Sequence, residues 1–396
     1  MLRVLLLAVG ALAVGTDAYV TAGLLPAIGA DLHEPASVTG QLVTVFMLCY
    51  ALLAPLAGAA LARWSVRQVL VGALGLFCLG NGASAMAPSL SVLMATRALA
   101  GVAAGVFVPV AAAAAAALGG PRRRGLALTV VLGGLSSGTV AGVPAGLWLA
   151  GRADWRAALW LVTAIGAAAL VGCLTLLPEV HGAAMPGLRE RLAQLGDRRV
   201  GTVVGATFLQ TVASLGLYTY LLPVLDGAGL TAHRTALWLW GAGGVTGSFL
   251  VGPLLDRTGR PRAQAALLLA ALAVCLAPLS LVSGTAVLAL LVLWGAAGWA
   301  FVVPQQHLLL GLRPSGGAAV LALNSSATYL GGSVGTALGG AVLSAGIAPG
   351  ALPPLAATVA AAACVLHLSG RRTTGLPRAA PDARPCPESD RERRPA

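Results

Sequence analysis

Long apolar stretches recur along this chain and limit its possible folds more than any other feature. We count twelve, each about 20 residues or longer, which is enough for a helix to cross the roughly 30 Å hydrocarbon core of a membrane. Only 10% of the 396 residues are charged, against about 25% in soluble proteins. The runs are also longer than the short alternating strands of a membrane barrel. We therefore expect an all-α membrane protein with twelve transmembrane helices in two six-helix bundles. The stretches lie near residues 4–28, 38–61, 69–89, 91–118, 125–150, 157–177, 201–225, 234–255, 264–283, 286–310, 316–345 and 350–369.

The arginines predict how the chain is oriented in the membrane. All 25 basic residues are Arg, and cytoplasmic loops of membrane proteins carry an excess of basic residues. With a cytoplasmic N-terminus, only Arg152, Arg156 and Arg234 fall in external connections. Both termini are therefore predicted to be cytoplasmic, in the cell membrane of a bacterium. The net charge of +12 then reflects topology and attraction to anionic lipid rather than nucleic acid binding. Thirteen arginines fall in cytoplasmic connections: Arg63, Arg67, Arg122, Arg123, Arg124, Arg189, Arg191, Arg198, Arg199, Arg257, Arg260, Arg262 and Arg313.

One carboxylate, Asp17, lies inside the first apolar stretch. A charge in the membrane costs roughly 2.5–3.5 kcal/mol on insertion scales and is a functional hypothesis by default. Asp17 is about 21 Å along a helix from Arg3, at a rise of 1.5 Å per residue. Arg97 reaches the same depth on the fourth stretch, which runs in the opposite direction, so the two side chains could pair. The alternatives are a structural Asp near a helix end and an Arg that clamps helix ends through backbone carbonyls.

The two halves of the chain match at a single offset of 194 residues. Six spans repeated in parallel are the layout of a transporter with its substrate path between two related bundles. We expect bundles at 1–178 and 201–369, a cytoplasmic linker at 179–200, and a disordered cytoplasmic tail at 370–396. The matched pairs are Gly58 with Gly252, Arg63 with Arg257, Gly101 with Gly295, Gly138 with Gly332, and Gly146 with Gly340.

The first stretch carries Gly15-Thr16-Asp17, then Gly23-Leu24-Leu25-Pro26 and Asp31-Leu32. This pattern resembles the first-span signature of the twelve-span drug/proton antiporter-1 group of the major facilitator superfamily. The resemblance extends over about residues 4–369. That group includes exporters of chloramphenicol, sugars and purine nucleosides.

The loop after the second stretch only partly resembles the superfamily motif Gly-x-x-x-Asp-Arg-x-Gly-Arg. Gly58 and Arg63 match, while Ala62 replaces the Asp and Ser65 the Gly. The resemblance implies that the charge latch of the inward gate is weaker in the first half, or is formed by Asp256 with Arg257. The second-half copy is better matched, at Gly252, Asp256, Arg257, Gly259 and Arg260.

Two further motifs concern the fourth and fifth stretches. Arg97 with Gly101 is similar to the family's Arg-x-x-x-Gly motif, which implies a part in proton coupling with Asp17. Gly138, Gly142, Pro144 and Gly146 are similar to a motif of the superfamily's exporters. The three glycines recur every four residues and share one helix face, where small residues let a neighbouring helix approach closely, and Pro144 favours a bend. Plain helix packing is the alternative to a hinge.

The substrate contacts are predicted from spans whose family counterparts line the central cavity. Ordinary packing is the alternative at each position. His307 could be a second titrating group, although a position at a cytoplasmic helix end also explains it. The candidate cavity residues are Tyr19, Phe46, Tyr50, Phe107, Gln210, Tyr218, Trp240, Asn324 and Tyr329.

We therefore expect a proton-coupled exporter of a small, fairly apolar organic compound that works by alternating access, as a monomer. A chloramphenicol-like drug follows from the resemblance, and a sugar or purine nucleoside is the rival substrate. No Cys/His cluster or clustered catalytic groups are visible, so neither a metal, an organic cofactor nor an enzyme is expected, and the proton gradient is the energy source. A non-transporting sensor on the same fold is the remaining alternative, and the presence of Asp17 and Arg97 argues against it.

Overall fold

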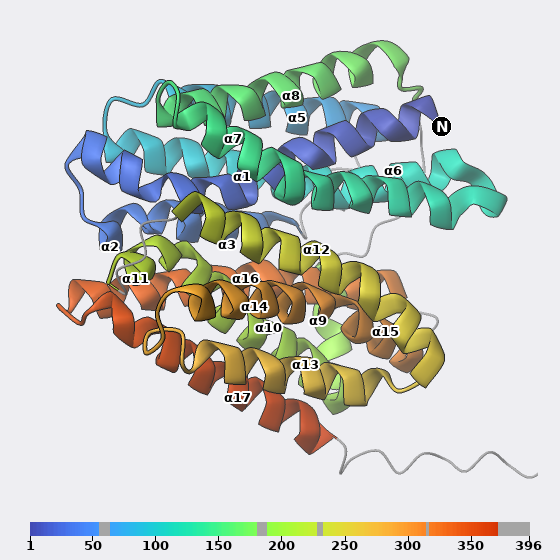
Figure 1. Cartoon of the computed structure of the whole chain (residues 1–396). Helices are drawn as coiled ribbons and strands as arrows, with labels where there is room; N and C mark the ends of the chain where they lie inside the picture. The colour runs from blue at the N-terminus through green and yellow to red at the C-terminus, as the bar shows by residue number, and fades with distance from the viewer. Residues whose placement is uncertain (55–63, 180–187, 228–232, 314–316, 371–396) are drawn as a thin grey trace, which may run out of the picture.

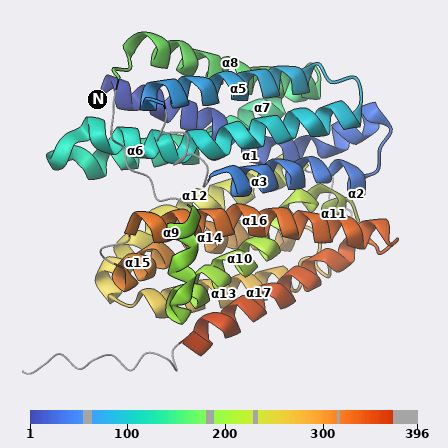
Figure 2. The same cartoon turned by 180° about the vertical axis from the view of Figure 1, so that it is seen from behind.

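The computed structural model describes residues 1–54, 64–179, 188–227, 233–313 and 317–370. These residues form helices joined by short connections, and they contain no strand (Figure 1). The helices pack in two layers. One layer contains the first half of the chain and the other contains the second half, as both views of the molecule show (Figures 1 and 2). The expected all-α architecture is confirmed.

Among the described residues, eight helical segments form the first layer. Ser65, at a position where the loop motif has Gly, caps the helix that follows it. Its hydroxyl accepts from Gln68 N–H, and the Gln68 side chain accepts from Ser65 N–H, as in a capping box. The segments are α1 (Leu2–Leu32), α2 (Ala36–Thr39), α3 (Gln41–Leu53), α5 (Val66–Ala85), α6 (Leu90–Ser137), the π-helical turn η2 (Gly138–Gly142), α7 (Val143–Ala150) and α8 (Trp155–Leu176).

The second layer begins after a short connection made of α9 (Leu188–Ala193) and η3 (Gln194–Gly196). Its helices pack on the first layer chiefly where α16 meets α3. There the Ser333 hydroxyl donates to the Thr44 carbonyl at 3.1 Å. The segments are α10 (Arg198–Thr219), α11 (Leu221–Gly227), α12 (His233–Thr258), α13 (Pro261–Leu276), α14 (Thr285–Ala300), α15 (Val302–Leu312), α16 (Gly317–Ser344), η4 (Pro349–Ala351) and α17 (Leu352–Ser369).

Nine helical stretches among the described residues are long and apolar enough to cross a membrane. Two further predicted spans coincide with α12 and α16, and the remaining one coincides with the shorter α13. The multi-pass character is therefore shown, while the count of twelve stays a prediction. The nine are Leu2–Leu32, Ala36–Leu53, Val66–Ala85, Leu90–Gly120, Arg123–Ala150, Trp155–Leu176, Arg198–Thr219, Thr285–Leu312 and Pro349–Ser369.

One predicted stretch ends earlier in the structure, and the break between two others is explained by a glycine. The stretch expected at 264–283 is helical only to Leu276, and Pro278 follows two residues later. Proline has no N–H to continue a helix, and its ring obstructs the carbonyl four residues before it. The stretches expected at 91–118 and 125–150 correspond to the spans Leu90–Gly120 and Arg123–Ala150, separated by a kink at Gly120, whose φ of 64° is left-handed and therefore favours glycine.

Candidate functional site

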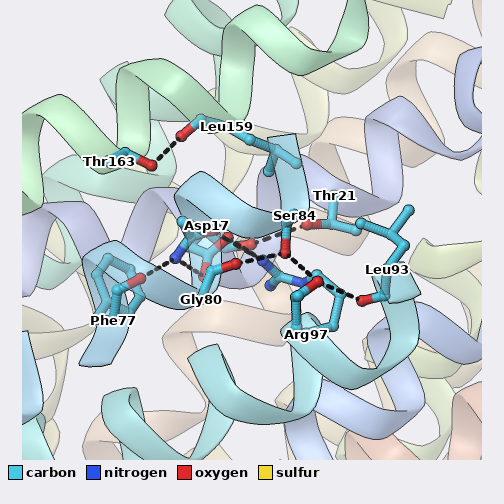
Figure 3. A network of polar contacts seen from close by, with 11 residues as sticks. Asp17, Thr21, Phe77, Gly80, Ser84, Leu93, Arg97, Leu159 and Thr163 are labelled. Atoms are coloured by element: carbon cyan, nitrogen blue, oxygen red, sulfur yellow. Dashed lines mark hydrogen bonds and ion pairs between the residues drawn. The ribbon is translucent and has the colours of Figure 1, made fainter. Parts of the chain in front are cut away.

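A buried ion pair joins the two intramembrane charges that the sequence singled out. Arg97 Nη1 of α6 lies 2.7 Å from Asp17 Oδ1 of α1 (Figure 3). The Asp17 side chain is 0% exposed and that of Arg97 only 2%. The pairing that helix depth made possible is therefore present, and it lies at the contact between α1 and α6.

Asn81 of α5 completes a triangle with this pair. Its Nδ2 donates to Asp17 Oδ2 at 3.2 Å, and its Oδ1 accepts from Arg97 Nη1 at 3.0 Å. A second bond from Nδ2 to the Phe77 carbonyl, at 3.1 Å, fixes the amide against its own helix. Asn81 was not among the predicted site residues, although it is an isolated amide in the apolar stretch at 69–89 and could have been found by that signal.

The side chains around Asp17 and Arg97 shield the ion pair from water and stabilise it. The Arg97 guanidinium lies 4.6 Å from the centre of the Phe46 ring, a cation–π contact from α3. Its Nε is buried and has no hydrogen-bond partner among the described residues. Two charges removed from water are stabilised mainly by each other, and removing one partner of such a pair typically destabilises a protein by about 3–5 kcal/mol. Neutralising Asp17 therefore changes the energy of this whole region.

Removing Asn81 should weaken the site without removing a charge. In Asn81→Ala, Asp17 Oδ2 and Arg97 each lose one buried hydrogen bond, which costs about 1–3 kcal/mol for a buried group left unpaired. We expect a lower melting temperature in detergent and several-fold slower transport. Ser84→Ala is the matched control, because Ser84 is buried on the same helix but, among the residues that the structure describes, its hydroxyl bonds to Gly80 and Thr96 and not to the ion pair. Equal effects of the two variants would show that Asn81 is an ordinary packing residue.

The fifth span contains η2, and the face of η2 with Gly138 and Gly142 packs directly against α1, next to Asp17. A Cβ added to Gly138 would overlap the Leu12 carbonyl, and one added to Gly142 would overlap the Thr16 hydroxyl. The Thr16 hydroxyl in turn donates to the Gly138 carbonyl at 3.1 Å. This contact puts the predicted hinge segment one residue away from the ion pair.

The backbone of this segment is a π-helical turn rather than a regular helix. Val143 N–H donates to the carbonyl of Gly138, five residues earlier. The turn ends at Gly142, two residues before Pro144, which has no N–H to donate. Single π-turns within α-helices are frequent at functional sites. The bend expected from Pro144 therefore takes the form of one wide turn at Gly138–Gly142.

Aromatic side chains from the two layers meet around Tyr19. Tyr19 of α1 lies 6.0 Å from Tyr218, 6.4 Å from Trp240 and 6.1 Å from Trp299, between ring centres. Tyr218 and Trp240 are stacked at 4.2 Å with 28° between their planes. Trp299, which lies on α14, was not among the cavity residues predicted from the sequence.

The other predicted cavity residues do not form one cluster, and their contacts differ. Tyr50 of α3 stacks on Tyr329 of α16 at 3.5 Å, which makes a second aromatic contact between the layers. Phe107 is fully buried, and its ring lies where a Cβ of Gly10 would be, as expected of a packing residue. Gln210 Nε2 donates to the Gly298 carbonyl at 3.3 Å. Asn324 is buried, and its Oδ1 has no partner among the described residues.

The predicted gate residues are only partly visible. Gly58 and Arg63 lie outside the described residues. In the second-half copy, Gly259 has a left-handed φ of 59°, which explains the glycine at that position. The side chains of Asp256, Arg257 and Arg260 are exposed, and within the described part of the chain Asp256 and Arg257 form no ion pair. Gly252 lies on α12 with open space beside it, and His307 is exposed on α15.

Arg191 in the linker is buried. The sequence predicted its position in a cytoplasmic connection but not its burial. Arg191 of α9 is 2% exposed, and its Nη2 donates to the Ala54 carbonyl at 3.4 Å. Burial lowers the pKa of Arg191 from its ordinary value, and the nearby Glu190 carboxylate opposes that shift. Helix α9 also contacts α16 (Figure 2), so the linker touches both layers.

The sequence and the fold both match known proteins. A profile of the Major Facilitator Superfamily matches residues 7–336. The chain belongs to this superfamily. It is 31% identical to the inner membrane transport protein YdhP of Escherichia coli K12, over 93% of this chain and 95% of that protein. It is also 36% identical to a chloramphenicol resistance protein of Streptomyces lividans, over 64% of this chain and 66% of that protein.

The structural comparison supports the same fold. A bacterial homologue of the human lysosomal transporter Spinster, solved in an inward-facing and occupied conformation, superposes with a TM-score of 0.77. The alignment covers 94% of this chain and 96% of the other at 16% identity. The expected family is thus confirmed. The protein is a multi-pass membrane transporter of the major facilitator superfamily and not an enzyme.

Proposed function

We propose that this transporter exports a small, fairly apolar organic compound across the cytoplasmic membrane in exchange for protons, by alternating access. The observation that carries the proposal is the buried Asp17–Arg97 ion pair, on a helix whose preceding residue, Thr16, packs against Gly138 and Gly142. A chloramphenicol-like drug is the substrate we favour. The similarity to a chloramphenicol resistance protein and the aromatic contact between the layers support that choice.

The proton step follows from the charges of the site. When Asp17 takes a proton, Arg97 keeps a buried positive charge and retains only Asn81 and the Phe46 ring as partners. An uncompensated buried charge is unstable, so the protonated transporter favours a different helix arrangement. The two protonation states of Asp17 are thereby linked to the two access states. No organic cofactor or metal takes part in this scheme, and a single chain suffices.

The test is export of labelled chloramphenicol from energised cells that express the protein. We expect a lower steady-state level of drug than in cells with an empty vector. A protonophore should abolish the difference, because it removes the driving force. Drug levels equal to those of the vector control would contradict the drug assignment, and labelled sugars and purine nucleosides would then be tested in the same cells.

A further inference from the structure

The linker helix α9 buries an arginine and exposes its leucines. Arg191 is 2% exposed, whereas Leu188 and Leu192 on the same helix are 49% and 50% exposed. A helix held on a protein by apolar packing has the reverse arrangement, because burying leucine is favourable and removing a charge from water is costly. The burial of Arg191 therefore needs a specific partner.

That partner belongs to the other half of the molecule. Arg191 Nη2 donates to the carbonyl of Ala54, which directly follows α3 of the first layer, at 3.4 Å. Of the described residues in the linker, only Arg191 is hydrogen-bonded to the first layer. Tyr50, four residues before Ala54, stacks on Tyr329 of α16 at 3.5 Å. The bond from Arg191 therefore lies at one end of the contact between α3 and α16.

The linker itself is fixed to the second layer. Helix α9 packs on α16 (Figure 2), and η3 packs on α10. Asp197, between η3 and α10, forms an ion pair with Arg313 at the end of α15, with 3.3 Å between Asp197 Oδ2 and Arg313 Nη2. The bond from Arg191 to Ala54 therefore connects the second layer to the first.

The opposite end of the contact between α3 and α16 is closed by packing. A Cβ added to Gly40 would overlap the Tyr220 hydroxyl, and one added to Gly340 would overlap the Gln41 side-chain amide. The two layers therefore touch at both ends of α3. Opening toward the cytoplasm requires the end at Ala54 to separate, and the bond from Arg191 has to break when it does.

We propose that Arg191 is a latch that holds the predicted cytoplasmic ends of α3 and α16 together and releases Ala54 each time the transporter opens inward. The proposal rests on the alternating access of the proposed function. It gives the linker the part that the sequence resemblance assigned to Asp256 and Arg257, which form no ion pair in the described part of the chain. The released guanidinium regains water, which offsets the lost hydrogen bond and lets the latch open and close within a cycle.

The separation of the two layers can be measured without substrate. A cytoplasmic label pair consists of spin-labelled unnatural amino acids at Gly125 and Ala263, exposed positions on α6 and α13 at the predicted cytoplasmic end. An external label pair at the exposed Ala153 and Ala345 reports the opposite end. Double electron–electron resonance on the purified full chain in lipid nanodiscs gives the populations of near and far distances for each pair.

Two variants of α9 are compared. Arg191→Met removes the donor and the charge but keeps a long side chain, and Arg189→Met makes the same change at an exposed position. A hydrogen bond to a charged group changes an equilibrium by about tenfold or more. We therefore expect Arg191→Met to raise the ratio of far to near distances for the cytoplasmic label pair about tenfold. Its external label pair should not shift to far distances, and Arg189→Met should match the native protein at both ends.

An unchanged ratio in Arg191→Met would overturn the proposal, as would an equal shift in Arg189→Met. Far distances for both label pairs would also overturn it, because they indicate general loosening of the fold. Should Arg191→Met fail to fold, Arg191→Lys keeps the charge on a shorter side chain, and a several-fold rise in the same ratio is expected; an unchanged ratio would again contradict the latch. Failure of the proposed function looks different: chloramphenicol export is then absent while the cytoplasmic label pair still responds to Arg191→Met.

Discussion

Replacing Asp17 by Asn is expected to abolish proton-driven export. The amide has the same shape and keeps one acceptor oxygen for Arg97, whose Nη1 lies 2.7 Å from Asp17 Oδ1. It cannot take up or release a proton. The variant should therefore allow the labelled drug to equilibrate across the membrane but not to be expelled against a gradient. Drug accumulation in energised cells, with and without a protonophore, measures this loss.

The chain offers a matched control on the same helix. Asp31, near the end of α1, pairs with Arg156 at 2.9 Å and is 42% exposed. Exposed ion pairs contribute only about 0–1 kcal/mol, so Asp31→Asn should fold and export nearly as the native protein does. The melting temperature of purified Asp17→Asn separates a transport defect from misfolding. Uphill export by a folded Asp17→Asn protein would remove Asp17 from the coupling mechanism.

The apolar lengths made the helical architecture predictable. Membrane-spanning helices must satisfy their backbone polar groups internally, so an apolar run of sufficient length permits few other structures. The same regularity allowed the depths of Asp17 and Arg97 to be compared, because helix rise is nearly constant. Boundaries were less predictable where a single residue decides them, as Pro278 does after α13.

The neighbours of the ion pair could not be predicted from depth. Depth along a span says nothing about which face of the helix points inward, and that depends on how the helices pack. Asn81 contacts Asp17 because α5 packs closely on α6, and Phe46 reaches Arg97 because α3 does the same. The burial of Arg191 likewise depends on tertiary contacts, since α9 packs on α16 and Arg191 bonds to the Ala54 carbonyl at the end of α3.

Replacing Gly138 by Ala is expected to disable the transporter through packing alone. The added Cβ would overlap the Leu12 carbonyl and would lie 2.7 Å from Thr16 N. Both are backbone atoms of α1, so no side chain can move aside and the two helices must separate. Overpacking of a well-packed interior costs typically about 1–3 kcal/mol. Separation would also break the bond from the Thr16 hydroxyl to the Gly138 carbonyl, one residue from the ion pair.

Gly133→Ala, five residues earlier on α6, isolates the effect of this contact. A Cβ on Gly133 meets no atom within 4 Å, so Ala there should be neutral or stabilise the helix by about 0.5–1 kcal/mol. We expect Gly138→Ala to lower the melting temperature in detergent and to reduce drug export to the level of the empty-vector control. Gly133→Ala should lower neither the melting temperature nor the export. A Gly138→Ala protein with native stability and export would show that α1 and the fifth span need no close contact. The hinge assigned to Gly138–Gly142 would then lose its physical basis, because a movement of that turn could not be transmitted to Asp17 through a loose interface.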